Sequence, residues 1–530
     1  MKKGMIVPLI TAVLWCVNVF AQSLPQNWFL LDPKTDHYYG VSAERAYNEL
    51  LQGKNSTTVI VAVIDGGVDV THEDLKNKVW VNPKEIPGNN IDDDRNGYID
   101  DVNGWDFIGG SDSDVQYDQF ELTRLYKLLH DKFGENTSAA ATTGNTEYQR
   151  YLRIKHDYDV KSAESRMNYT MYNRFLTVMN DLFEAVGSDN PTLEQIQNFR
   201  PADTSIILIN AQQIVLSMMK QGTSAAELRT EIEEGIDEVR ADAEYHYNPD
   251  YDPRPIVGDN YNDASQRYYG NNHVAGPDPL HGTHVSGIIA ADRDNNMGIK
   301  GIAENVKILV VRCVPDGDER DKDVANSIRY AVDMGAKVIN MSFGKGYSYN
   351  KKAVDDAMKY AMDHDVLLIH GAGNDGMNID TATVVPNKYF EDGGVANNFI
   401  NVGANMWDNR VARFSDYGKK NVDLFAPGVQ IYSTVPGNKY RNLQGTSMAS
   451  PMVAGVAAMI RSYFPQLTAV QVKEILMKSV VKMPKKVMVP ADEMDPKAKM
   501  KKAKLKKLCV SGGVVNAYNA VKLAEKKIRH

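Results

Sequence analysis

The sequence is poor in cysteine, with only Cys16, Cys313 and Cys509 among its 530 residues. Cys16 lies in the apolar N-terminal stretch, so the other two could form one disulfide at most. Small exported domains that depend on disulfides carry many more cysteines, which excludes a cysteine-stapled fold. Whether Cys313 pairs with Cys509 stays open, because their positions in the sequence do not decide it.

The chain also lacks an excess of basic residues. It contains 60 Lys and Arg against 68 Asp and Glu, a formal net charge of −8. Nucleic-acid binding normally needs a basic surface, so we set that class of partner aside. One local exception is residues 497–507, where seven lysines predict a solvated loop or, as the alternative, contact with an anionic surface.

The N-terminus reads MKKGMIVPLITAVLWCVNVFAQ, with two lysines before a short apolar run that ends in Val19-Phe20-Ala21. This pattern predicts a secretory signal peptide over residues 1–21. A membrane anchor is the weaker interpretation, because the run is short and is interrupted by Pro8 and Asn18. We therefore expect an exported protein, secreted or held in the periplasm or cell envelope, with no transmembrane span after signal removal.

Short apolar runs rich in β-branched residues recur along the chain and are typical of strands buried on both faces. Amphipathic stretches at 322–335 and 351–364 predict helices between them. Strands that alternate with helices predict an α/β fold, a three-layer α/β/α arrangement around a mostly parallel sheet. The predicted strands are 58–64, 306–312, 337–342, 366–370, 399–404 and 422–425.

Residues 111–250 break this alternation, because long polar side chains recur there at helical spacing. We expect a mostly helical insertion, and no apolar stretch within it is long enough to span a membrane. Residues 22–57 form a short lead-in before the first strand. The main domain is then expected over 58–530, interrupted by the insertion.

Four polar residues stand at positions suited to catalysis. Asp65 ends the first predicted strand in VAVIDGGVD, at the sheet edge where α/β proteins place functional groups. His281 opens HGTHVSGIIA, and Ser447 lies in GTSMASP at the predicted start of a helix. Asn374 lies on the glycine-rich loop of LLIHGAGNDG, where its amide could donate to an oxyanion.

Acyl transfer by a serine requires this set of groups. A hydroxyl is a weak nucleophile until an imidazole takes its proton, and a carboxylate must hold the imidazole in the right tautomer. A histidine pair such as His281 and His284 is as often structural as functional when it stands alone. The combination of all four residues is what predicts the chemistry.

The segments VIDGGVD, HGTHVSGIIA and GTSMASPMVAGVAA resemble the three signatures of the subtilisin-like serine peptidases, the subtilase or peptidase S8 family. VINMSFG and GAGND resemble the substrate-lining strand and the oxyanion loop of that family. The similarity covers residues 58–110, 255–465 and 512–524. Gly66 departs from the commoner pattern, in which Ser or Thr follows the aspartate, and so removes a hydroxyl near Asp65.

The resemblance implies a role for each residue of the set. Asp65 would orient the imidazole, His281 would act as general base and then acid, and Ser447 would be the nucleophile. Asn374 would donate to the oxyanion beside the Ser447 backbone N–H, while His284 would pack inside its helix. Polypeptide substrates would pair with an extended cleft, one wall of which would be Ser342, Phe343 and Gly344.

The sequence thus predicts an exported serine endopeptidase. The alternative is a catalytically impaired peptide-binding or chaperone-like protein on the same scaffold. A lipase or esterase would need GxSxG where Ser447 stands in GTSMA, and the sedolisin relatives carry glutamate where His281 stands. The natural substrate and the oligomeric state cannot be read from the sequence.

An acidic loop at 89–101, NNIDDDRNGYIDD, has oxygen-bearing side chains at alternate positions and a glycine at the turn. This spacing is typical of a calcium loop. The alternative is a solvated acidic turn, but five aspartates within ten residues would repel one another without a cation. The expected structural Ca²⁺ has as ligands Asp92, Asp94, Asn96, the Tyr98 carbonyl and Asp100.

The aspartate and histidine of the predicted triad are 216 residues apart, far more than the few tens usual in the family. The insertion must therefore leave the main domain and return to it near the active-site edge. We expect it to cap or flank the substrate cleft. A peripheral position or a role in oligomer contacts is the alternative.

Overall fold

The computed structural model describes residues 24–134, 145–200, 206–220, 222–408, 410–482, 486–490 and 500–529. The predicted signal peptide at 1–21 and the lysines at 497–499 lie outside these residues. Within the described ranges, none of the helices combines the length and the apolar character that a membrane span requires.

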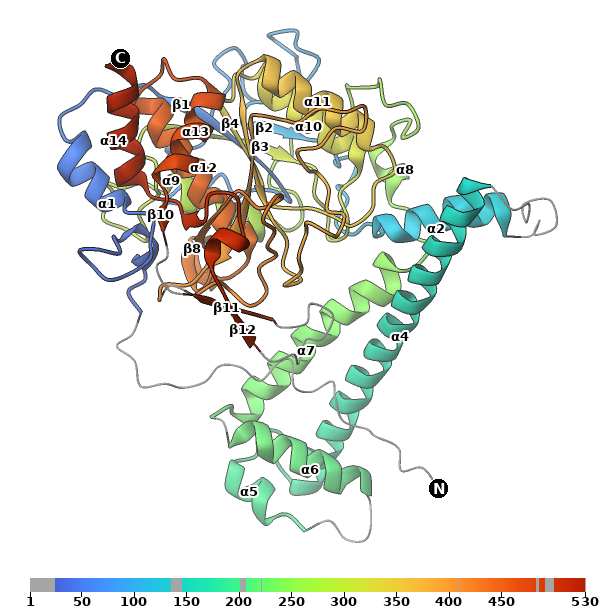
Figure 1. Ribbon diagram of the computed structural model, residues 1–530. Coiled ribbons are helices and arrows are strands. Elements are labelled where there is room, and N and C mark those ends of the chain that lie inside the picture. The colour runs from blue at the N-terminus through green and yellow to red at the C-terminus, as the bar shows by residue number, and fades with distance from the viewer. Residues whose placement is uncertain are drawn as a thin grey trace.

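The main domain is built on a sheet for which nine strands are described, in the order β10-β13-β7-β6-β5-β4-β1-β3-β2 (Figure 1). Its neighbouring strands run parallel except for β10, which is antiparallel to β13. The predicted α/β fold with a mostly parallel sheet is confirmed. The strands are β1 Val59–Asp65, β2 Gly104–Asp106, β3 Val306–Arg312, β4 Val338–Met341, β5 Leu367–Gly371, β6 Phe399–Asn405, β7 Leu424–Pro427, β10 Val481–Lys482 and β13 Gly513–Val514.

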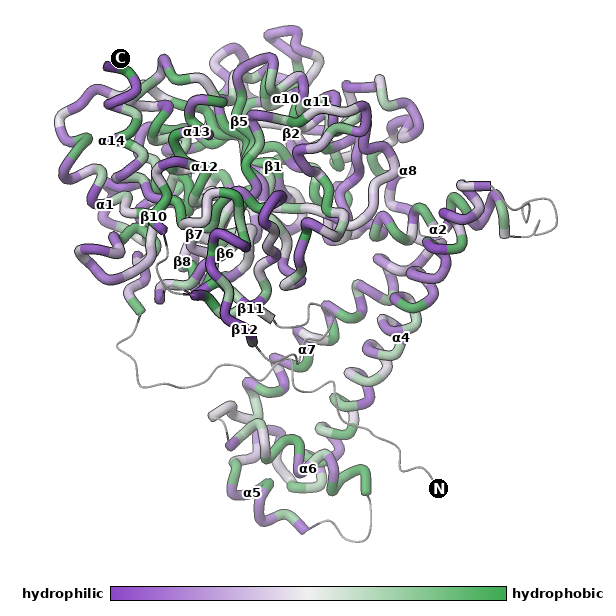
Figure 2. The backbone as a smooth tube through the Cα atoms, in the orientation of Figure 1, coloured by the Kyte–Doolittle hydropathy of each residue, from purple (hydrophilic) through white to green (hydrophobic). Residues whose placement is uncertain are grey.

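Alternate residues of the central strand β1 face opposite layers. Val61 and Val63 pack into one apolar core, whereas Ala62 and Ile64 pack into the other. Successive side chains of a strand point to opposite faces, and a parallel sheet covered on both sides needs apolar residues at every position. In Figure 2 many of the hydrophobic stretches of the main domain gather in its interior, around β1 and β5.

Two groups of helices cover the sheet. The first core is completed by α9 Leu280–Ala290, α12 Thr446–Tyr463, α13 Ala469–Ser479 and α14 Ala517–Ile528. The second is completed by α10 Asp321–Asp333 and α11 Lys351–Asp363, which connect β3, β4 and β5. The main domain also contains short helical turns, which are η1 Trp28–Leu30, α1 Ala43–Ala46, η2 Tyr47–Leu51, α8 Arg254–Val257 and η4 Leu505–Lys507.

Two antiparallel hairpins lie outside the main sheet. One pairs β8 Ile431–Val435 with β9 Lys439–Leu443, and the other pairs β11 Val487–Pro490 with β12 Met500–Ala503. Cys313 and Cys509 are both buried as free thiols. The question left open by the sequence is therefore answered in this structure, which contains no disulfide between them.

Between β2 and α9 the chain forms a helical arm, defined here as residues 121–246. Its helices are α2 Glu121–Phe133, α4 Thr146–Val186, α5 Leu193–Asn198, α6 Ile206–Met219, α7 Ala225–Ala241 and η3 Asp242–His246. Figure 1 shows α4 and α7 running away from the sheet, with α5 and α6 at the far end. That far end has a small apolar core of its own, to which Leu182, Phe183, Ile196, Val215 and Leu228 contribute.

The start and end of α4 follow local rules. The Asn145 side chain accepts hydrogen bonds from the N–H groups of Glu147 and Tyr148, which satisfies two free donors of the first turn. Gly187 ends the helix with a φ of +80°, a conformation that glycine adopts without strain.

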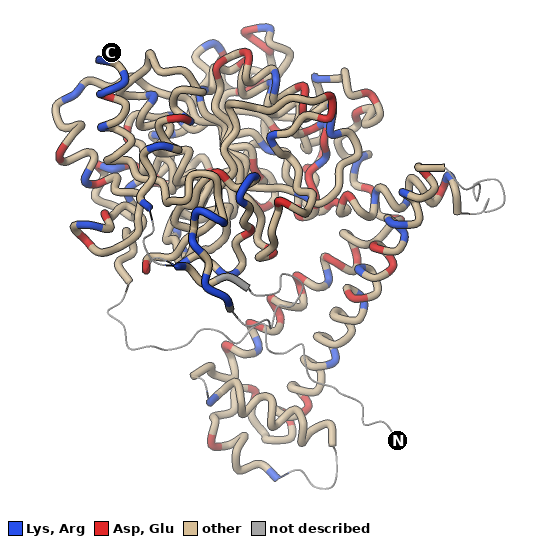
Figure 3. Tube along the Cα trace, in the orientation of Figure 1, with Lys and Arg blue, Asp and Glu red and all other residues tan. Residues whose placement is uncertain are grey.

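Acidic residues line α7, whereas lysines gather on the β11–β12 hairpin (Figure 3).

A buried group of ion pairs, which we call the root cluster, lies at the base of the arm, and the arm contributes Glu121 and Arg124 to it. Arg320 pairs with Asp118 at 2.6 Å, and Arg254 pairs with Asp259 at 2.5 Å and with Asp323 at 2.6 Å. Buried charges are tolerated when each has an opposite partner. The members of the root cluster are Asp118, Glu121, Arg124, Arg254, Asp259, Arg320, Asp321, Asp323 and Lys345.

Candidate active site

The site begins at the carboxyl end of β1, where Asp65 meets the first turn of α9. His281 Nδ1 donates to Asp65 Oδ1 at 2.8 Å, and the Gly66 N–H donates to the same oxygen at 2.8 Å. This approach requires Gly282, because a Cβ there would lie 2.2 Å from the Gly67 carbonyl oxygen. The glycine that follows the histidine in HGTH therefore lets the helix come close enough for the pair to form.

The Asp65 carboxylate also sets the electrostatics of the imidazole. Burial opposes the charged form, but the charge of Asp65 and its hydrogen bond outweigh that penalty and raise the pKa of His281 above its ordinary value. The His281 side chain is 40% exposed, so the ring stays within reach of a substrate. An imidazole held in this way can take up a proton and release it.

Ser447 lies in the first turn of α12, after Gly445, whose φ of 151° favours glycine. Its Oγ donates to the Ser342 carbonyl at 3.2 Å, and Ser342 Oγ donates to the Ser447 carbonyl at 2.9 Å. The hydroxyl thus faces the segment after β4 and not His281. Without substrate, hydrogen bonds between a nucleophile and its base are often long or absent, and they tighten in the complex.

Asn374 is fixed from one side of its amide. Its Oδ1 accepts from the Thr446 backbone N–H at 2.9 Å and from Thr446 Oγ1 at 3.0 Å. These two bonds occupy the amide oxygen and leave the Nδ2 donor for another acceptor. Because Thr446 adjoins Ser447, the same contact ties this donor to the nucleophile.

Asp416 contacts the loop that carries Asn374, and no sequence motif would have revealed this role. Its Oδ1 accepts from the backbone N–H groups of Asp375 at 3.1 Å and Met377 at 2.8 Å. Burial raises the pKa of Asp416 to about 7, although these hydrogen bonds favour the charged form. Asp416 therefore holds the loop that carries Asn374 in place through Asp375 and Met377, which are 41 and 39 residues away from it in sequence.

His284 has a structural role. Its ring is buried, and Nε2 donates to the carbonyl oxygens of Ile431 at 2.9 Å and Arg441 at 3.1 Å. Burial lowers the pKa of His284 to about 4, so the ring is neutral at pH 7. The second histidine of HGTH therefore packs against the β8–β9 hairpin, a contact that the sequence did not predict.

A pocket of about 390 Å³ opens beside His281. It lies between the segment that follows β3 and the segment that follows β4. Two of the three residues predicted to form a cleft wall, Ser342 and Phe343, line it; Gly344 follows directly in the chain. The lining residues are Asp65, Gly66, Gln116, Asp278, His281, Arg312, Val314, Pro315, Asp316, Ser342 and Phe343.

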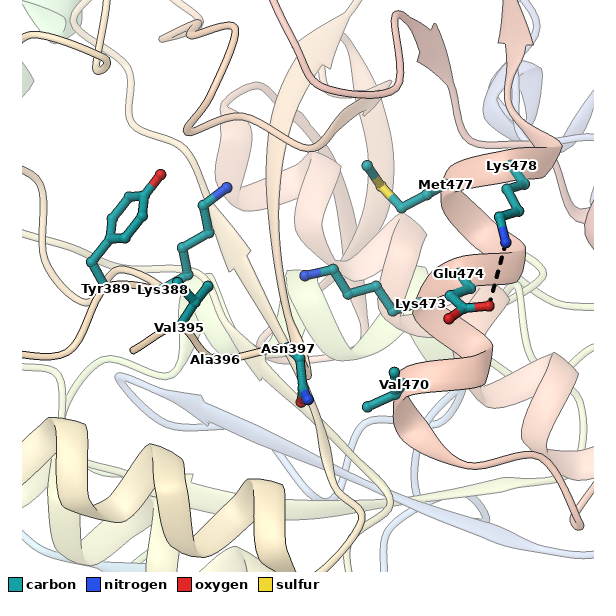
Figure 4. Close-up of a pocket in the computed structure, with 10 residues that line it drawn as sticks. All are labelled: Lys388, Tyr389, Val395, Ala396, Asn397, Val470, Lys473, Glu474, Met477 and Lys478. Atoms are coloured by element: carbon teal, nitrogen blue, oxygen red, sulfur yellow. Dashed lines mark hydrogen bonds and ion pairs between the residues drawn. The ribbon is translucent and has the colours of Figure 1, made fainter. Parts of the chain in front are cut away.

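A larger cavity, of about 520 Å³, lies between α13 and residues 388–397, which precede β6 (Figure 4). None of the four predicted catalytic residues lines it. Lys478 and Glu474 are hydrogen-bonded to each other on its rim. Asp65 and His281 line the smaller pocket, whereas Ser447 and Asn374 line neither of the two. The larger cavity is lined by Lys388, Tyr389, Val395, Ala396, Asn397, Val470, Lys473, Glu474, Met477 and Lys478.

The acidic loop brings together a group of carboxylates that differs from the predicted ligand set. Oxygen atoms of Glu85, Asp92 and Asp94 lie within 4.8 Å of one another. Glu85 is only 7% exposed, and its Oε2 is buried without a hydrogen-bond partner in the described structure. Glu85 precedes the alternating motif, so the spacing of the motif could not reveal it.

The other predicted ligands are engaged in the loop itself. Asp100 accepts from the Gly88 N–H at 3.0 Å and the Asn90 N–H at 2.6 Å, and it is not among the carboxylates that meet around Glu85. Its role as a ligand stays a prediction. Asn96 Oδ1 accepts from the Tyr98 N–H at 2.8 Å and braces the turn.

Comparison with known proteins agrees with this geometry. The model of the subtilase family, Peptidase S8, matches residues 56–512. A thermophilic serine proteinase from Bacillus sp. (strain AK1) is 36% identical over 288 residues, which cover 53% of this chain and 62% of that protein. Subtilisin DY from Bacillus licheniformis is 40% identical over 200 residues, which cover 37% of this chain and 68% of that protein.

Thermitase from Thermoactinomyces vulgaris is 40% identical over 183 residues, which cover 34% of this chain and 61% of thermitase. The match thus spans less than two thirds of two of these three relatives. The family model, in contrast, extends over most of the present sequence. With Asp65, His281 and Ser447 at the same edge of the sheet, the chain belongs to the subtilase family of S8 peptidases.

Proposed function

We propose that the protein is an exported serine endopeptidase that hydrolyses polypeptides through an acyl-enzyme on Ser447. The observation that carries this proposal is the 2.8 Å hydrogen bond between His281 and a buried carboxylate 216 residues away. A structural histidine has no need of an exposed face, a carboxylate partner and a neighbouring pocket at once. Export rests on the N-terminal sequence pattern alone.

In the proposed mechanism, Ser447 Oγ turns from the Ser342 carbonyl to His281 and attacks the scissile carbonyl carbon as His281 takes its proton. The tetrahedral intermediate collapses, the C–N bond breaks, and His281 gives the proton to the leaving amine. Water then loses a proton to His281, attacks the acyl carbon and releases the acid, and the proton returns to Ser447. The Asp65 carboxylate stabilises the imidazolium through its hydrogen bond to His281.

Stabilisation of the oxyanion is assigned to two donors. Asn374 has an unused Nδ2, because Thr446 occupies its amide oxygen. The Ser447 backbone N–H lies at the start of α12, where unpaired donors and the helix dipole favour negative charge. Donors fixed before the reaction lower the barrier without reorganisation in the transition state.

We also propose that the acidic loop holds a structural Ca²⁺. Three carboxylates and a buried unpartnered oxygen on Glu85 fit a hard cation that prefers oxygen ligands. Burial raises the pKa of Glu85, as expected for a carboxylate without a counter-charge. Asp92, Asp94 and Glu85 would bind the ion, which would neutralise their mutual repulsion and stabilise the loop.

Removal of calcium tests this site. EDTA should lower the unfolding midpoint of the wild type, because an ion at 100 times its Kd adds about 2.7 kcal/mol to the stability of the folded state. Glu85→Gln should lose most of that calcium-dependent shift, whereas Asp112→Asn, at an exposed site outside the loop, should keep it. Equal midpoints for the wild type with calcium and with EDTA would exclude the site.

The activity is tested with a fluorophosphonate label and a casein digest of the purified protein in calcium buffer. Ser447→Ala should lose both labelling and hydrolysis, by about 10⁶-fold in kcat. Ser113→Ala, at an exposed serine outside the site, should keep both. A folded wild-type protein that is neither labelled nor active would instead support the peptide-binding or chaperone-like alternative.

A further inference from the structure

The pocket beside His281 contains carboxylates that the proposed mechanism does not use. Its lining includes Asp278, which lies just before α9, and Asp316, which lies in the segment that follows β3. Asp278 is exposed, and the side chain of Asp316 is 55% exposed. Both charges are therefore open to a molecule that enters the 390 Å³ pocket.

Asp278 carries a charge that the fold does not neutralise. Its Oδ1 accepts a hydrogen bond from the Leu280 N–H at 3.0 Å, and among the described residues it takes part in no ion pair. Its charge reaches the proposed general base. Burial opposes the charged form of His281, but Asp65 and, more weakly, Asp278 raise its pKa. Asp278 thus places an uncompensated negative charge beside the reacting groups.

Asp316 shares its only described cation with a second carboxylate. His246 Nε2 lies 3.3 Å from Asp316 Oδ1, while Nδ1 of the same ring lies 2.9 Å from Asp242 Oδ1. Even when His246 is protonated, a single positive charge faces two negative ones. One negative charge is therefore in excess at this side of the pocket.

Arg312 also belongs to the lining, but its charge is used inside the protein. Its Nη1 donates to the Asp106 carboxylate at 2.7 Å. Nε donates to the Gly66 carbonyl at 2.8 Å, and Nη2 donates to the Val115 carbonyl. The side chain is 2% exposed. Arg312 is thus a fixed part of the pocket wall, and Asp106 balances its charge.

Asp65 adds an acceptor without a partner to the same lining. Its side chain is 3% exposed, and Oδ1 accepts from His281 and from the Gly66 N–H. Oδ2, in contrast, is buried and has no hydrogen-bond partner in the described structure. A buried carboxylate oxygen without a partner is unfavourable, and a nearby positive charge reduces that cost. The pocket therefore favours a cation as its occupant.

The rest of the lining suits the stem of a long side chain. Val314, Pro315 and Phe343 contribute apolar surface to the pocket, and its volume is large enough for one side chain. Lys and Arg have an apolar stem, which can pack on such residues while the charged head meets the carboxylates. An apolar side chain would take water from the carboxylates without replacing it, and an acidic one would be repelled.

We propose that Asp278 and Asp316 make this pocket a specificity pocket for a cationic side chain of the substrate, Lys or Arg. This inference rests on the proposed peptidase activity and names its substrate class, which is polypeptides with a basic residue near the cleaved bond. The basic residue is near that bond because His281, the proposed proton carrier, belongs to the same lining. Asp278 and Asp316 select the substrate and take no part in bond cleavage.

The test is a set of internally quenched peptides built on one uncharged core sequence. Arg, norleucine or Glu replaces one residue at a time on both sides of the cleaved bond, and mass spectrometry of the products identifies that bond. At one position we expect kcat/KM to be about tenfold higher for Arg than for norleucine, the ratio expected from two partly exposed ion pairs. Glu should give the lowest value there. Equal values for the three residues at every position would overturn the inference.

The variant Asp278→Asn with Asp316→Asn should bring the ratio of Arg to norleucine at that position close to one. Because the ratio compares two peptides in one protein at one pH, a change in the pKa of His281 cancels. The matched control, Asp131→Asn with Asp363→Asn, removes the same charge from exposed sites outside the pocket and should keep the ratio. An unchanged ratio in the folded pocket variant would contradict the assignment.

Asp278→Asn alone serves if the double variant does not fold. Asp278 is exposed, and an asparagine oxygen can still accept from the Leu280 N–H. This single variant should lower the ratio about threefold, as the loss of one of two similar ion pairs would. A ratio equal to that of the wild type would remove Asp278 from the proposal.

Fluorophosphonate labelling separates this inference from the proposed function. A labelled protein that cleaves the Arg, norleucine and Glu peptides equally well is a peptidase without a preference for cations, so only the specificity pocket fails. A folded protein that is not labelled and cleaves none of the peptides refutes the activity itself.

Discussion

Two groups of polar residues lie at the same end of the sheet, and they differ in whether their polar atoms are paired and buried. In the root cluster each charge has an opposite partner, and its side chains are buried. In the proposed catalytic group, Asn374 keeps a free donor and His281 is 40% exposed. Paired charges fix a structure, whereas unpaired donors and an accessible imidazole remain available to a substrate.

Loss of one root-cluster residue should therefore act on stability before activity. Arg254→Ala leaves the buried carboxylate of Asp323 without its ion-pair partner and leaves Asp259 with Lys322 alone, which we expect to cost about 3–5 kcal/mol. Chemical unfolding measures the loss. A loss below about 1 kcal/mol would mean that these ion pairs do not stabilise the fold.

The converse should hold for the catalytic group. Asn374→Ala removes one oxyanion donor and should lower kcat by about 10²–10³-fold, equivalent to about 2.7–4 kcal/mol of transition-state stabilisation. The free energy of unfolding should change by less than about 0.5 kcal/mol, because the residue is exposed. Equal effects on stability and rate would break the contrast between the two groups.

His246 lies beside the root cluster, and its titration makes the stability of the folded state depend on pH. Burial lowers the pKa of His246, but hydrogen bonds and ion pairs with Asp242 and Asp316 outweigh it and raise the value to about 9. The folded state thus holds this proton more tightly than the unfolded chain does, so the stabilisation is complete below about pH 6.5 and is lost as the pH rises through about 9. The shift corresponds to roughly 3 kcal/mol at most.

Urea unfolding between pH 6 and pH 9.5 checks this effect. His246→Gln should remove the decline that the wild type shows over that range, and the difference between the two curves isolates His246 from other groups that titrate. Parallel curves would show that the histidine contributes no pH-dependent stability. Labelling of Ser447 at fixed pH should be the same in both proteins.

The smallest effect is expected at the rim of the pocket. Asp278 helps to raise the pKa of His281 through its charge, although Asp65 contributes more. Asp278→Asn should move the acid limb of kcat/KM to lower pH, because the neutral imidazole then persists further into the acid range. Asp112→Asn is the distant control. A shift to higher pH would contradict the electrostatic account of the site.

The parts of the structure that the sequence predicted well share one property, which is that their signal is local. The apolar run at 306–312 coincides with β3, because a strand buried on both faces needs apolar residues throughout. The strand β9, KYRNL, is largely exposed and polar and gave no such signal. The pair of Asp65 and His281 was found through motifs, since no spacing rule connects residues so far apart.

The root cluster could not be predicted from the sequence. Lys345 meets Glu121 across 224 residues, and Arg320 meets Asp118 across 202. Charged residues in a polar insertion ordinarily predict a solvated surface. Only the packing of α2 against the segments that follow β3 and β4 shows that these charges are buried. Glu85 was missed for another reason, because it precedes the alternating motif of the acidic loop.

The position of β1 between β3 and β4 has a consequence for the order of folding. Closing the 216-residue loop between Asp65 and His281 costs about 5 kcal/mol of chain entropy if the loop is unstructured. The arm shortens that loop, since its ends are held together where Gln119 donates to the Asn248 carbonyl at 2.7 Å. Because Ser447 follows β1, β3, β4, β5, β6 and β7 in the chain, the proposed triad can be completed only after these strands have been synthesised.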